Sequence, residues 1–440
     1  MHLINSILLF IFIFPFSSLA RSWKPGDGCP EILVATVPGN RYRSEPQFDS
    51  MQSVHLALTS CPNITTLDLR VTWLGCSEAP DRWNLPFKLK GGDKYPPLKS
   101  LRLEGYYFDH REWEDAEFRN QGFGYPSFLE KWGSWIRTGN IWKAVQYSFM
   151  KPEQKNKTNL DLWLDAMDWS QLESLGLRGG HRSMDAFVEK VVPRLTSLSG
   201  LDMIDQAGNT TLQILKSLNN NSLKNLTWIG TWPSDVLPSI LSLHGKSLQH
   251  LEVRSEEEMD VPTPVFNNSQ LSLLSRLAPN LTHLSINIHR NGTWPIETFN
   301  AISAIPSLRT AEIWLDIVSE CRRQWPEEYS RQYEQWVRLN QSCLGEDQYQ
   351  KPFVDEKSSL ELFKHMREEK VGEKLKSVKF WVGDHSRSWD GPIYLPTWIE
   401  GKRAEVMCSV ESKRDDTEWC VGKGMGYWER SSGFLDDYEE

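Results

Sequence analysis

A recurring pattern of apolar residues constrains this chain more than any other feature of its sequence. In each copy, one apolar residue is followed three positions later by a second and two positions after that by a third, as in Ile64, Leu67 and Leu69. The copies begin at Ile64, Leu98, Leu172, Leu198, Leu223, Leu248, Leu281, Leu308 and Leu375. Their first residues lie 34, 74, 26, 25, 25, 33, 27 and 67 positions apart, and the central intervals are typical of strand–helix repeats.

Each copy predicts a short strand with one buried face, because its last two apolar residues alternate with other residues. Helical segments are expected before several copies, at 184–192, 212–218, 236–243, 271–277 and 296–305. One strand and one helix cannot bury their own apolar faces, so neighbouring copies must supply the core. We therefore expect an α/β solenoid with a parallel sheet on its concave side, helices outside, irregular insertions and a C-terminal hairpin cap.

Three segments of the chain resemble the repeats of leucine-rich-repeat proteins: SCPNITTLDLRV, YPPLKSLRLEG and APNLTHLSINI. They are most similar to irregular fungal members related to the F-box type, and the resemblance covers about residues 48–382. The asparagine that is usual at the ninth repeat position is absent, with Thr72 in the first copy and Gly383 in the last. The loops after the strands must therefore satisfy their backbone differently. No F-box precedes the repeats, so the resemblance does not imply a ubiquitin-ligase adaptor.

The first twenty residues have the pattern of a signal peptide. Leu8 to Phe16 is apolar, and Ser18 and Ala20 supply the small residues of a cleavage site. No later apolar run is long enough for a membrane span, and the acidic C-terminus lacks a lipid-anchor signal. We expect a secreted chain without a membrane anchor. The expected divisions are a signal peptide at 1–20, an N-terminal cap at 21–47, a repeat domain at 48–395 with insertions at about 105–166 and 315–370, and a cap with an acidic tail at 396–440.

Nine Asn-x-Ser/Thr sequons agree with passage through the secretory pathway. Each predicts a surface position, because an attached glycan cannot be buried. The sequons begin at Asn63, Asn156, Asn209, Asn220, Asn225, Asn267, Asn280, Asn291 and Asn340.

Seven cysteines in an exported chain predict disulfides and one unpaired thiol. A hairpin centred on Arg414 would place Cys408 directly opposite Cys420. Cys321 and Cys343 bracket a polar helical insertion and form the second expected pair. For the third pair, Cys29 and Cys61 each lie three residues before an expected strand, so parallel neighbours would bring them together. Pairing of Cys61 with Cys76 is the alternative.

The formal net charge of -9 argues against a nucleic-acid partner, which requires a basic surface. The sequence contains no motif for nucleophilic or zinc-dependent catalysis, and we expect no enzyme activity, cofactor or metal. Two alternatives remain. One is a glycan hydrolase that uses Asp161 and Asp165, since a carboxylate pair can perform acid–base chemistry. The other is an extracellular structural protein without a discrete ligand.

The favoured hypothesis is a binding scaffold that recognises an extracellular protein or polysaccharide. The residues between the apolar strand positions are expected to face the concave surface, where mixed charges and aromatic rings suit recognition. An aromatic stripe in the first insertion, which includes Trp142 and Phe149, is a second candidate surface or a helix packed on the sheet. The candidate ligand-binding residues are Arg70, Arg102, Arg178, His250, Glu252, Arg254, His283, Trp314 and Trp381. Asn225 projects onto the same surface in this register. A glycan there would obstruct the middle of the surface, so either this sequon is unused or the ligand binds elsewhere.

Overall fold

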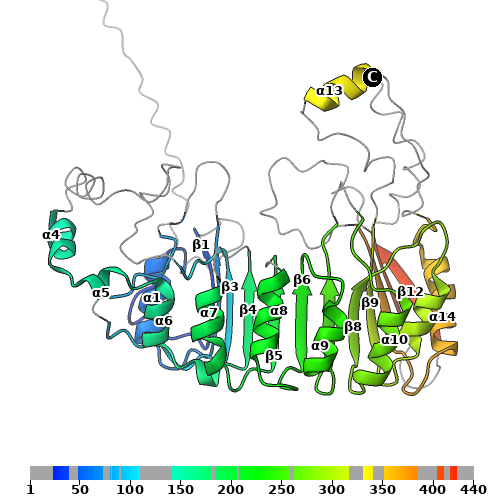
Figure 1. The fold of residues 1–440 in the computed structure, drawn as a ribbon, viewed down its shortest axis with the longest axis horizontal. Helices are drawn as coiled ribbons and strands as arrows, with labels where there is room; N and C mark the ends of the chain where they lie inside the picture. The colour runs from blue at the N-terminus through cyan, green and yellow to red at the C-terminus, as the bar shows by residue number, and fades with distance from the viewer. Residues whose placement is uncertain are drawn as a thin grey trace, which may run out of the picture.

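Twelve strands form one open sheet in the order of the chain, β1 to β12 (Figure 1). The structure is a computed structural model. It describes residues 23–38, 48–72, 80, 82–88, 91–109, 141–179, 184–205, 208–257, 262–316, 331–339, 351–383, 404–410 and 417–423. Strands β1 to β10 are parallel, and β11 and β12 continue the sheet as antiparallel strands. The architecture is therefore a mixed α/β fold with a mostly parallel sheet.

The strands are short, as the repeat predicts. Their bounds are β1 Ile32–Val37, β2 Thr66–Val71, β3 Ser100–Glu104, β4 Ser174–Arg178, β5 Gly200–Ile204, β6 Asn225–Ile229, β7 His250–Arg254, β8 His283–Asn287, β9 Thr310–Leu315, β10 Ser377–Val382, β11 Ala404–Val410 and β12 Glu418–Lys423.

Helices α7 to α10 lie along one face of the sheet, in front of the strands (Figure 1). Consecutive helices contact one another in the order α7, α8, α9, α10, α11 and α14. The helices are α1 Met51–Ser60, α4 Ile141–Phe149, α5 Pro152–Lys155, α6 Asn159–Ala166, α7 Asp185–Lys190, α8 Gly208–Ser217, α9 Val236–His244, α10 Asn268–Leu277, α11 Ile296–Ser303, α13 Arg331–Arg338 and α14 Glu356–Glu368, with short 3₁₀ turns at Trp169–Gln171 and Val192–Arg194. Helices occur at all five segments where the sequence predicts them.

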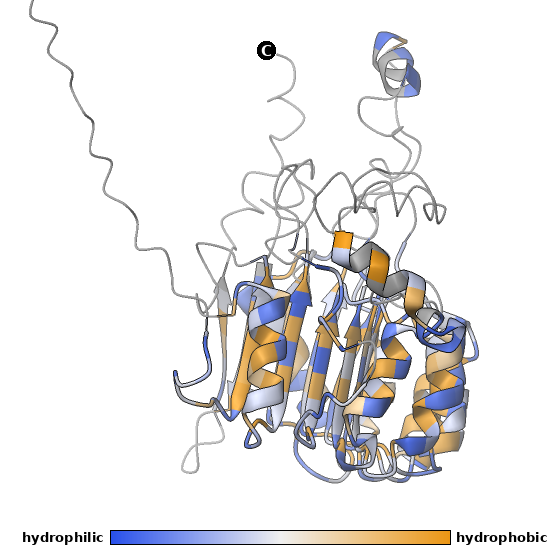
Figure 2. Cartoon of the chain, turned by 90° about the vertical axis from the view of Figure 1, so that its left-hand side faces the viewer, coloured by the Kyte–Doolittle hydropathy of each residue, from blue (hydrophilic) through white to orange (hydrophobic). Residues whose placement is uncertain are grey.

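The apolar positions of the nine copies form the core. All 27 of these residues are at most 2% exposed. The strand leucines also align in register: Leu67 pairs with Leu101, Leu101 pairs with Leu175, and the series continues to Val378 on β10. Figure 2 shows the resulting alternation of apolar and polar bands along the strands. Each copy thus buries its apolar residues against those of its neighbours, as the repeat predicts.

The turns after the strands are satisfied by main-chain bonds between neighbouring copies. The N–H of Gly105 donates to the carbonyl of Arg178 at 3.1 Å, and the N–H of Gly179 donates to that of Ile204 at the same distance. Gly105 has φ 66° and Gly179 has φ 84°, a left-handed conformation that glycine adopts without steric cost. These bonds extend the hydrogen-bonded ladder of the strands by one residue. They use main-chain groups alone and need no asparagine side chain at the ninth repeat position.

A second row of bonds joins the turns before the strands. Asn280 donates from Nδ2 to the carbonyl of Lys246 at 2.8 Å. Serine occupies the corresponding position in two other copies. Ser247 donates from Oγ to the carbonyl of Leu223 at 2.5 Å, and Ser307 donates from Oγ to the carbonyl of Pro279 at 2.6 Å. This position therefore favours a small polar side chain that reaches the preceding turn.

Replacing Asn280 with alanine is expected to lower the free energy of unfolding by about 1 kcal/mol, because one hydrogen bond between turns is lost. Asn280→Ser should retain most of the stability, since serine makes the same bond at the corresponding position in other copies. Asn209→Ala removes a sequon of similar exposure and should be neutral. Denaturant unfolding of deglycosylated protein checks the series, and equal stability of the alanine and serine variants would contradict it.

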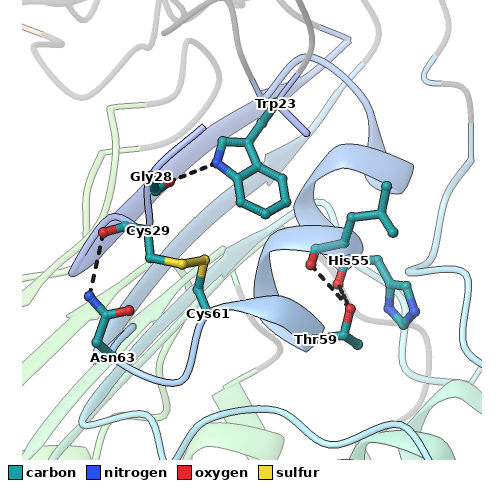
Figure 3. Close-up of a disulfide and its surroundings, with 8 residues drawn as sticks. Trp23, Gly28, Cys29, His55, Thr59, Cys61 and Asn63 are labelled. Atoms are coloured by element: carbon teal, nitrogen blue, oxygen red, sulfur yellow. Dashed lines mark hydrogen bonds between the residues drawn. A yellow bond between two sulfur atoms is a disulfide. The ribbon is translucent and has the colours of Figure 1, made fainter. Parts of the chain in front are cut away.

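Two expected disulfides are present. Cys408 pairs directly with Cys420 across the β11–β12 hairpin, and Cys29 is bonded to Cys61 with Cα atoms 5.4 Å apart (Figure 3). The expectation that Cys29 and Cys61 each lie three residues before a strand is wrong by two residues for Cys61, because Ile32 pairs with Thr66 in the sheet. Cys61 instead caps the C-terminus of α1, and the turn before β2 brings it beside Cys29. Cys76, Cys321 and Cys343 lie outside the described residues.

Parts of both expected insertions belong to the packed helix layer. Trp163 on α6 and Phe363 on α14 are fully buried, and each of these helices precedes a strand of the sheet. In contrast, Trp142 and Phe149 on α4 are 84% and 86% exposed, so these two aromatic residues do not pack on the sheet. Within the described ranges, none of the helices has the length and apolar character that a membrane crossing needs.

Candidate functional site

The candidate surface is the face of the sheet that the helices leave uncovered. On β2, buried Leu67, Leu69 and Val71 alternate with half-buried residues, so the two sets point to opposite faces. We call the second set, continued through β10, the open face. The nine predicted binding residues all stand at open-face positions of the register. They fall into two groups, one on β2–β4 and the other on β7–β10.

The first group belongs to a network of ion pairs on β2–β5, which we call the charged ladder. Its members are Asp68, Arg70, Arg102, Glu104, Arg178 and Asp202. Glu104 on β3 pairs with an arginine on each neighbouring strand: Arg70 Nη2 lies 3.0 Å from Oε1, and Arg178 Nη1 lies 3.9 Å from Oε2. Charges of both signs therefore alternate across adjacent strands.

Arg102 on β3 links β2 and β5 in the charged ladder. Its Nη1 lies 3.6 Å from Oδ2 of Asp68 on β2, and its Nη2 lies 3.3 Å from Oδ2 of Asp202 on β5. The side chain crosses β4 over Gly176, where an added Cβ would lie 3.2 Å from Cγ of Arg102. The absence of a side chain at Gly176 thus allows the crossing. Arg102 remains 59% exposed, so its guanidinium is accessible to a partner.

The pKa of one carboxyl group in the charged ladder is shifted. Partial burial raises the pKa of Asp68 above its ordinary value, and the nearby Glu104 carboxylate acts in the same direction. Arg102 and Arg70 oppose the increase. Cationic residues in the ladder therefore partly compensate for the burial of this carboxylate.

Three residues of the second group form a stack with Lys379 on β7, β9 and β10, which we call the aromatic stack. Arg254, Trp314, Trp381 and Lys379 follow one another in this order. The Trp314 and Trp381 rings are stacked with centroids 5.0 Å apart. Arg254 Cζ lies 3.8 Å from the Trp314 centroid, and Lys379 Nζ lies 3.4 Å from that of Trp381. Because the two rings are stacked on each other, cations this close to the centroids lie on the outer faces of the ring pair.

The polar edges of the stack are also bonded. Nε1 of Trp314 donates to Oγ of Ser285 at 2.9 Å, and Nε1 of Trp381 donates to Oε2 of Glu312 at 2.6 Å. Arg254 donates from Nε to Glu252 at 2.7 Å. Both faces and the polar edge of Trp314 are therefore occupied, and only 9% of this residue is exposed. Each tryptophan ring therefore contacts the other ring and a cation, which disfavours stacking of a sugar on either ring.

Two stacked histidines lie beside the aromatic stack. His250 and His283 are paired residues on β7 and β8, and their rings are nearly parallel with centroids 4.1 Å apart. Nδ1 of His283 lies 2.8 Å from Oγ1 of Thr310. Burial, together with the neighbouring His250, lowers the pKa of His283 to about 4, whereas Glu252 acts in the opposite direction. His283 is therefore neutral above about pH 5.

Sequence reasoning missed the residues that fix these side chains. Ser285 accepts the hydrogen bond from Trp314, Thr310 shares a hydrogen bond with Nδ1 of His283, and Glu405 on β11 pairs with Lys379 at 3.3 Å. Strand register alone would have identified Ser285, since it pairs with Glu252 on one side and with Glu312 on the other. The contact of Glu405 could not be predicted in this way, because it depends on the pairing of β10 with β11, which no repeat pattern specifies.

The eight sequon asparagines within the described residues are all exposed, as a surface position predicts. Asn63 and Asn280 also bond neighbouring turns, and Asn63 donates from Nδ2 to the carbonyl of Cys29 (Figure 3). Asn225 is on the open face, where its register places it between Gly200 and His250. Asn340 lies outside the described residues.

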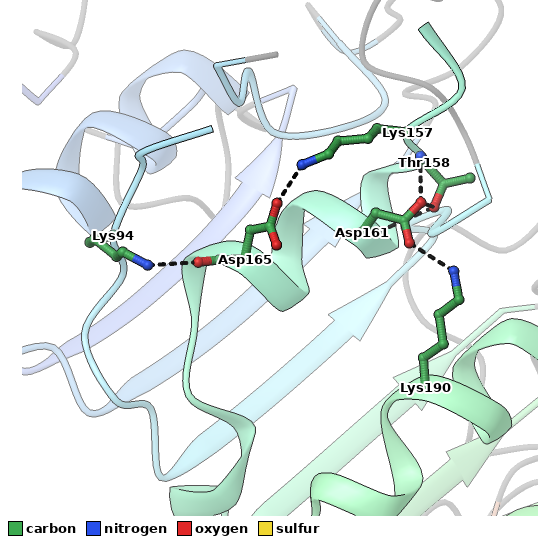
Figure 4. A network of polar contacts seen from close by, with 6 residues as sticks. All are labelled: Lys94, Lys157, Thr158, Asp161, Asp165 and Lys190. Carbon is green, nitrogen blue, oxygen red and sulfur yellow. Dashed lines mark hydrogen bonds and ion pairs between the residues drawn. The ribbon is translucent and has the colours of Figure 1, made fainter. Parts of the chain in front are cut away.

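The carboxylates of the hydrolase alternative serve in local contacts (Figure 4). Asp161 closes the capping box of α6 with Thr158 and lies 2.8 Å from Nζ of Lys190. Asp165 lies 2.5 Å from Nζ of Lys157. Although partial burial acts to raise it, the pKa of Asp161 is lowered by the bonds from Lys190 and Thr158. A general acid needs the opposite shift, so this arrangement does not favour proton donation.

A small pocket opens at the carboxyl ends of β7–β10. Asn287 in its lining accepts from the N–H of Ser255 and donates to the carbonyl of the same residue. Asp316 accepts from the N–H and the hydroxyl of Thr263, at 3.1 and 2.7 Å. These polar groups are bonded within the protein and do not define a ligand. No cluster of metal-binding side chains occurs in the part of the chain that the structure describes.

Comparison with known proteins finds no match to the chain among family models, curated proteins or solved structures.

Proposed function

We propose that this chain is an exported scaffold of the leucine-rich-repeat type, a curved solenoid that binds an extracellular protein through its open face and catalyses no reaction. The in-register copies and their helix layer support the solenoid assignment. The apolar run at the N-terminus, the sequons and the two disulfides support export into an oxidising compartment.

The observation that carries the proposal is the charged ladder on an uncovered sheet face. Its six residues present both signs of charge on neighbouring strands, and Arg102 is the most exposed of them. Alternating charge favours a protein partner with complementary charges, because like charges placed opposite each other cost several kcal/mol. A polysaccharide partner is less favoured, because both tryptophan rings of the aromatic stack are covered by neighbouring side chains.

Reversing the charge of Arg102 tests the function. Immobilised secreted protein is incubated with extracellular proteins from its source, and bound proteins are quantified at increasing concentration. We expect saturable binding of a protein that Arg102→Glu weakens at least about tenfold, since loss of one charge complement is worth about 1.4 kcal/mol or more. Lys364→Glu on the exposed side of α14 is the matched control and should bind as the unaltered chain does.

Two outcomes would contradict the proposal. Equal weakening by both charge reversals would show that net charge, and not the open face, governs binding. Absence of saturable binding by folded, secreted protein would favour the structural alternative.

A further inference from the structure

Asn225 belongs to a glycosylation sequon and lies on the open face of the sheet. It is the first residue of β6 and is exposed, whereas the next residue, Leu226, is buried. In the register Asn225 pairs with Gly200 on β5 and with His250 on β7. Gly200 has no side chain, so the β5 side leaves room for a group attached to Nδ2 of Asn225.

His250 presents an aromatic surface on the other side of Asn225. Neighbouring strands are about 4.8 Å apart, so parallel rings on paired residues stack along the row that crosses the strands. His250 stacks in this way on His283, with centroids 4.1 Å apart and an angle of 9° between the rings. One face of His250 is therefore covered by His283, and the opposite face is turned toward β6 and Asn225. The bond to Thr310 fixes the His283 ring behind it.

We propose that Asn225 carries an N-linked glycan whose first N-acetylhexosamine lies against the outer face of the His250 ring. The inference rests on the proposed export of the chain, because only the secretory pathway supplies the lipid-linked sugar donor. The transfer forms a bond between Nδ2 of Asn225 and the anomeric carbon of the sugar. It breaks the bond from that carbon to the diphosphate of the lipid donor, and the lipid diphosphate leaves as Nδ2 loses a proton.

The apolar C–H face of the sugar then contacts a flat ring that the protein already holds in place. Aromatic faces favour such contacts, and a fixed ring loses little conformational entropy when the contact forms. The attachment point lies between the charged ladder on β2–β5 and the aromatic stack on β7–β10. A partner on the charged ladder therefore approaches beside the glycan, which limits its footprint toward β7.

The test uses full-length secreted protein with uniform high-mannose glycans. Peptide mass spectrometry gives the occupancy of Asn225 and of Asn209, an exposed sequon at the start of α8 that serves as the reference. An endoglycosidase that cuts between the first two sugars is then applied to the folded protein. We expect cleavage at Asn225 to be about fivefold slower than at Asn209, the factor that a contact of aromatic-pair strength gives.

Two substitutions of His250 distinguish contact with the sugar from general steric hindrance of the enzyme at Asn225. His250→Ala should raise the cleavage rate at Asn225 to that at Asn209, whereas His250→Phe should keep it slow because the ring is retained. Equal rates in the unaltered protein, or an unchanged slow rate in His250→Ala, would overturn the proposed contact. If Asn209 carries a glycan and Asn225 does not, the proposed glycosylation of Asn225 is wrong but the proposed export is unaffected. Absence of the chain from the medium, or of glycan at every sequon, would overturn both this inference and the proposed export.

Discussion

Replacing Gly105 with alanine is expected to lower the free energy of unfolding by about 4 kcal/mol. Gly105 follows β3 with φ 66°, a conformation that costs an alanine about 1–2 kcal/mol. A Cβ at this position would also lie 2.1 Å from the carbonyl oxygen of Val71 on the preceding strand. This contact is with backbone, so it can be relieved only by separating β2 from β3 at the turn.

Gly179→Ala is the matched control for this prediction. Gly179 follows β4 in the same type of turn with φ 84°, but its added Cβ would meet its nearest neighbour at an ordinary 3.6 Å. It should therefore lose only about 1–2 kcal/mol, the cost of the left-handed conformation. Urea or guanidinium unfolding of the two variants measures the difference. Equal losses would contradict the close packing of the turns between copies.

Trp314→Ala should destabilise the protein by about 3–5 kcal/mol, as removal of a large buried aromatic side chain does. The substitution removes the ring between Arg254 and Trp381 and leaves Oγ of Ser285 without its donor. Trp314→Phe keeps an aromatic ring in the stack and loses the Nε1 bond, so its loss should be about 1–2 kcal/mol. Thermal and denaturant unfolding of the variants provide the measurement.

Trp142→Ala is the control for the aromatic stack. Trp142 is 84% exposed on α4, and its removal should change stability by no more than about 0.5 kcal/mol. If Trp314→Ala were as mild as this control, the aromatic stack would not be a stabilising element. The two tryptophans would then be free to act as binding residues, as the sequence hypothesis had them.

The strand positions were predictable because the burial of one strand face determines which sequence positions are apolar. A strand with one buried face requires apolar residues two positions apart, and Leu67 and Leu69 show this spacing as do Leu101 and Leu103. Since consecutive copies stack, their order in the sheet follows from their order in the chain. The Cys408–Cys420 pair was predictable for a similar reason, because a short hairpin fixes which residues lie opposite each other.

The contacts that the open-face side chains make with one another were not predictable from the spacing of residues in the sequence. Register places Trp314 and Trp381 side by side, but it does not say that Arg254 and Lys379 cover their outer faces. That arrangement depends on the rotamers of long side chains on strands that are distant in sequence. The crossing of Arg102 over β4 likewise depends on Gly176, whose role appears only when β3, β4 and β5 are adjacent.

Carboxylate labelling of the isolated protein and of its complex with the captured partner tests the proposed binding face most directly. A carbodiimide-coupled amine modifies accessible Asp and Glu side chains, and mass spectrometry reports the extent at each one. We expect complex formation to reduce labelling of Asp68, Glu104 and Asp202 on the charged ladder, and to leave the exposed Glu189 on α7 and Glu361 on α14 unchanged. Protection of the helix carboxylates with unchanged labelling of the charged ladder would show that the partner does not bind at the charged ladder.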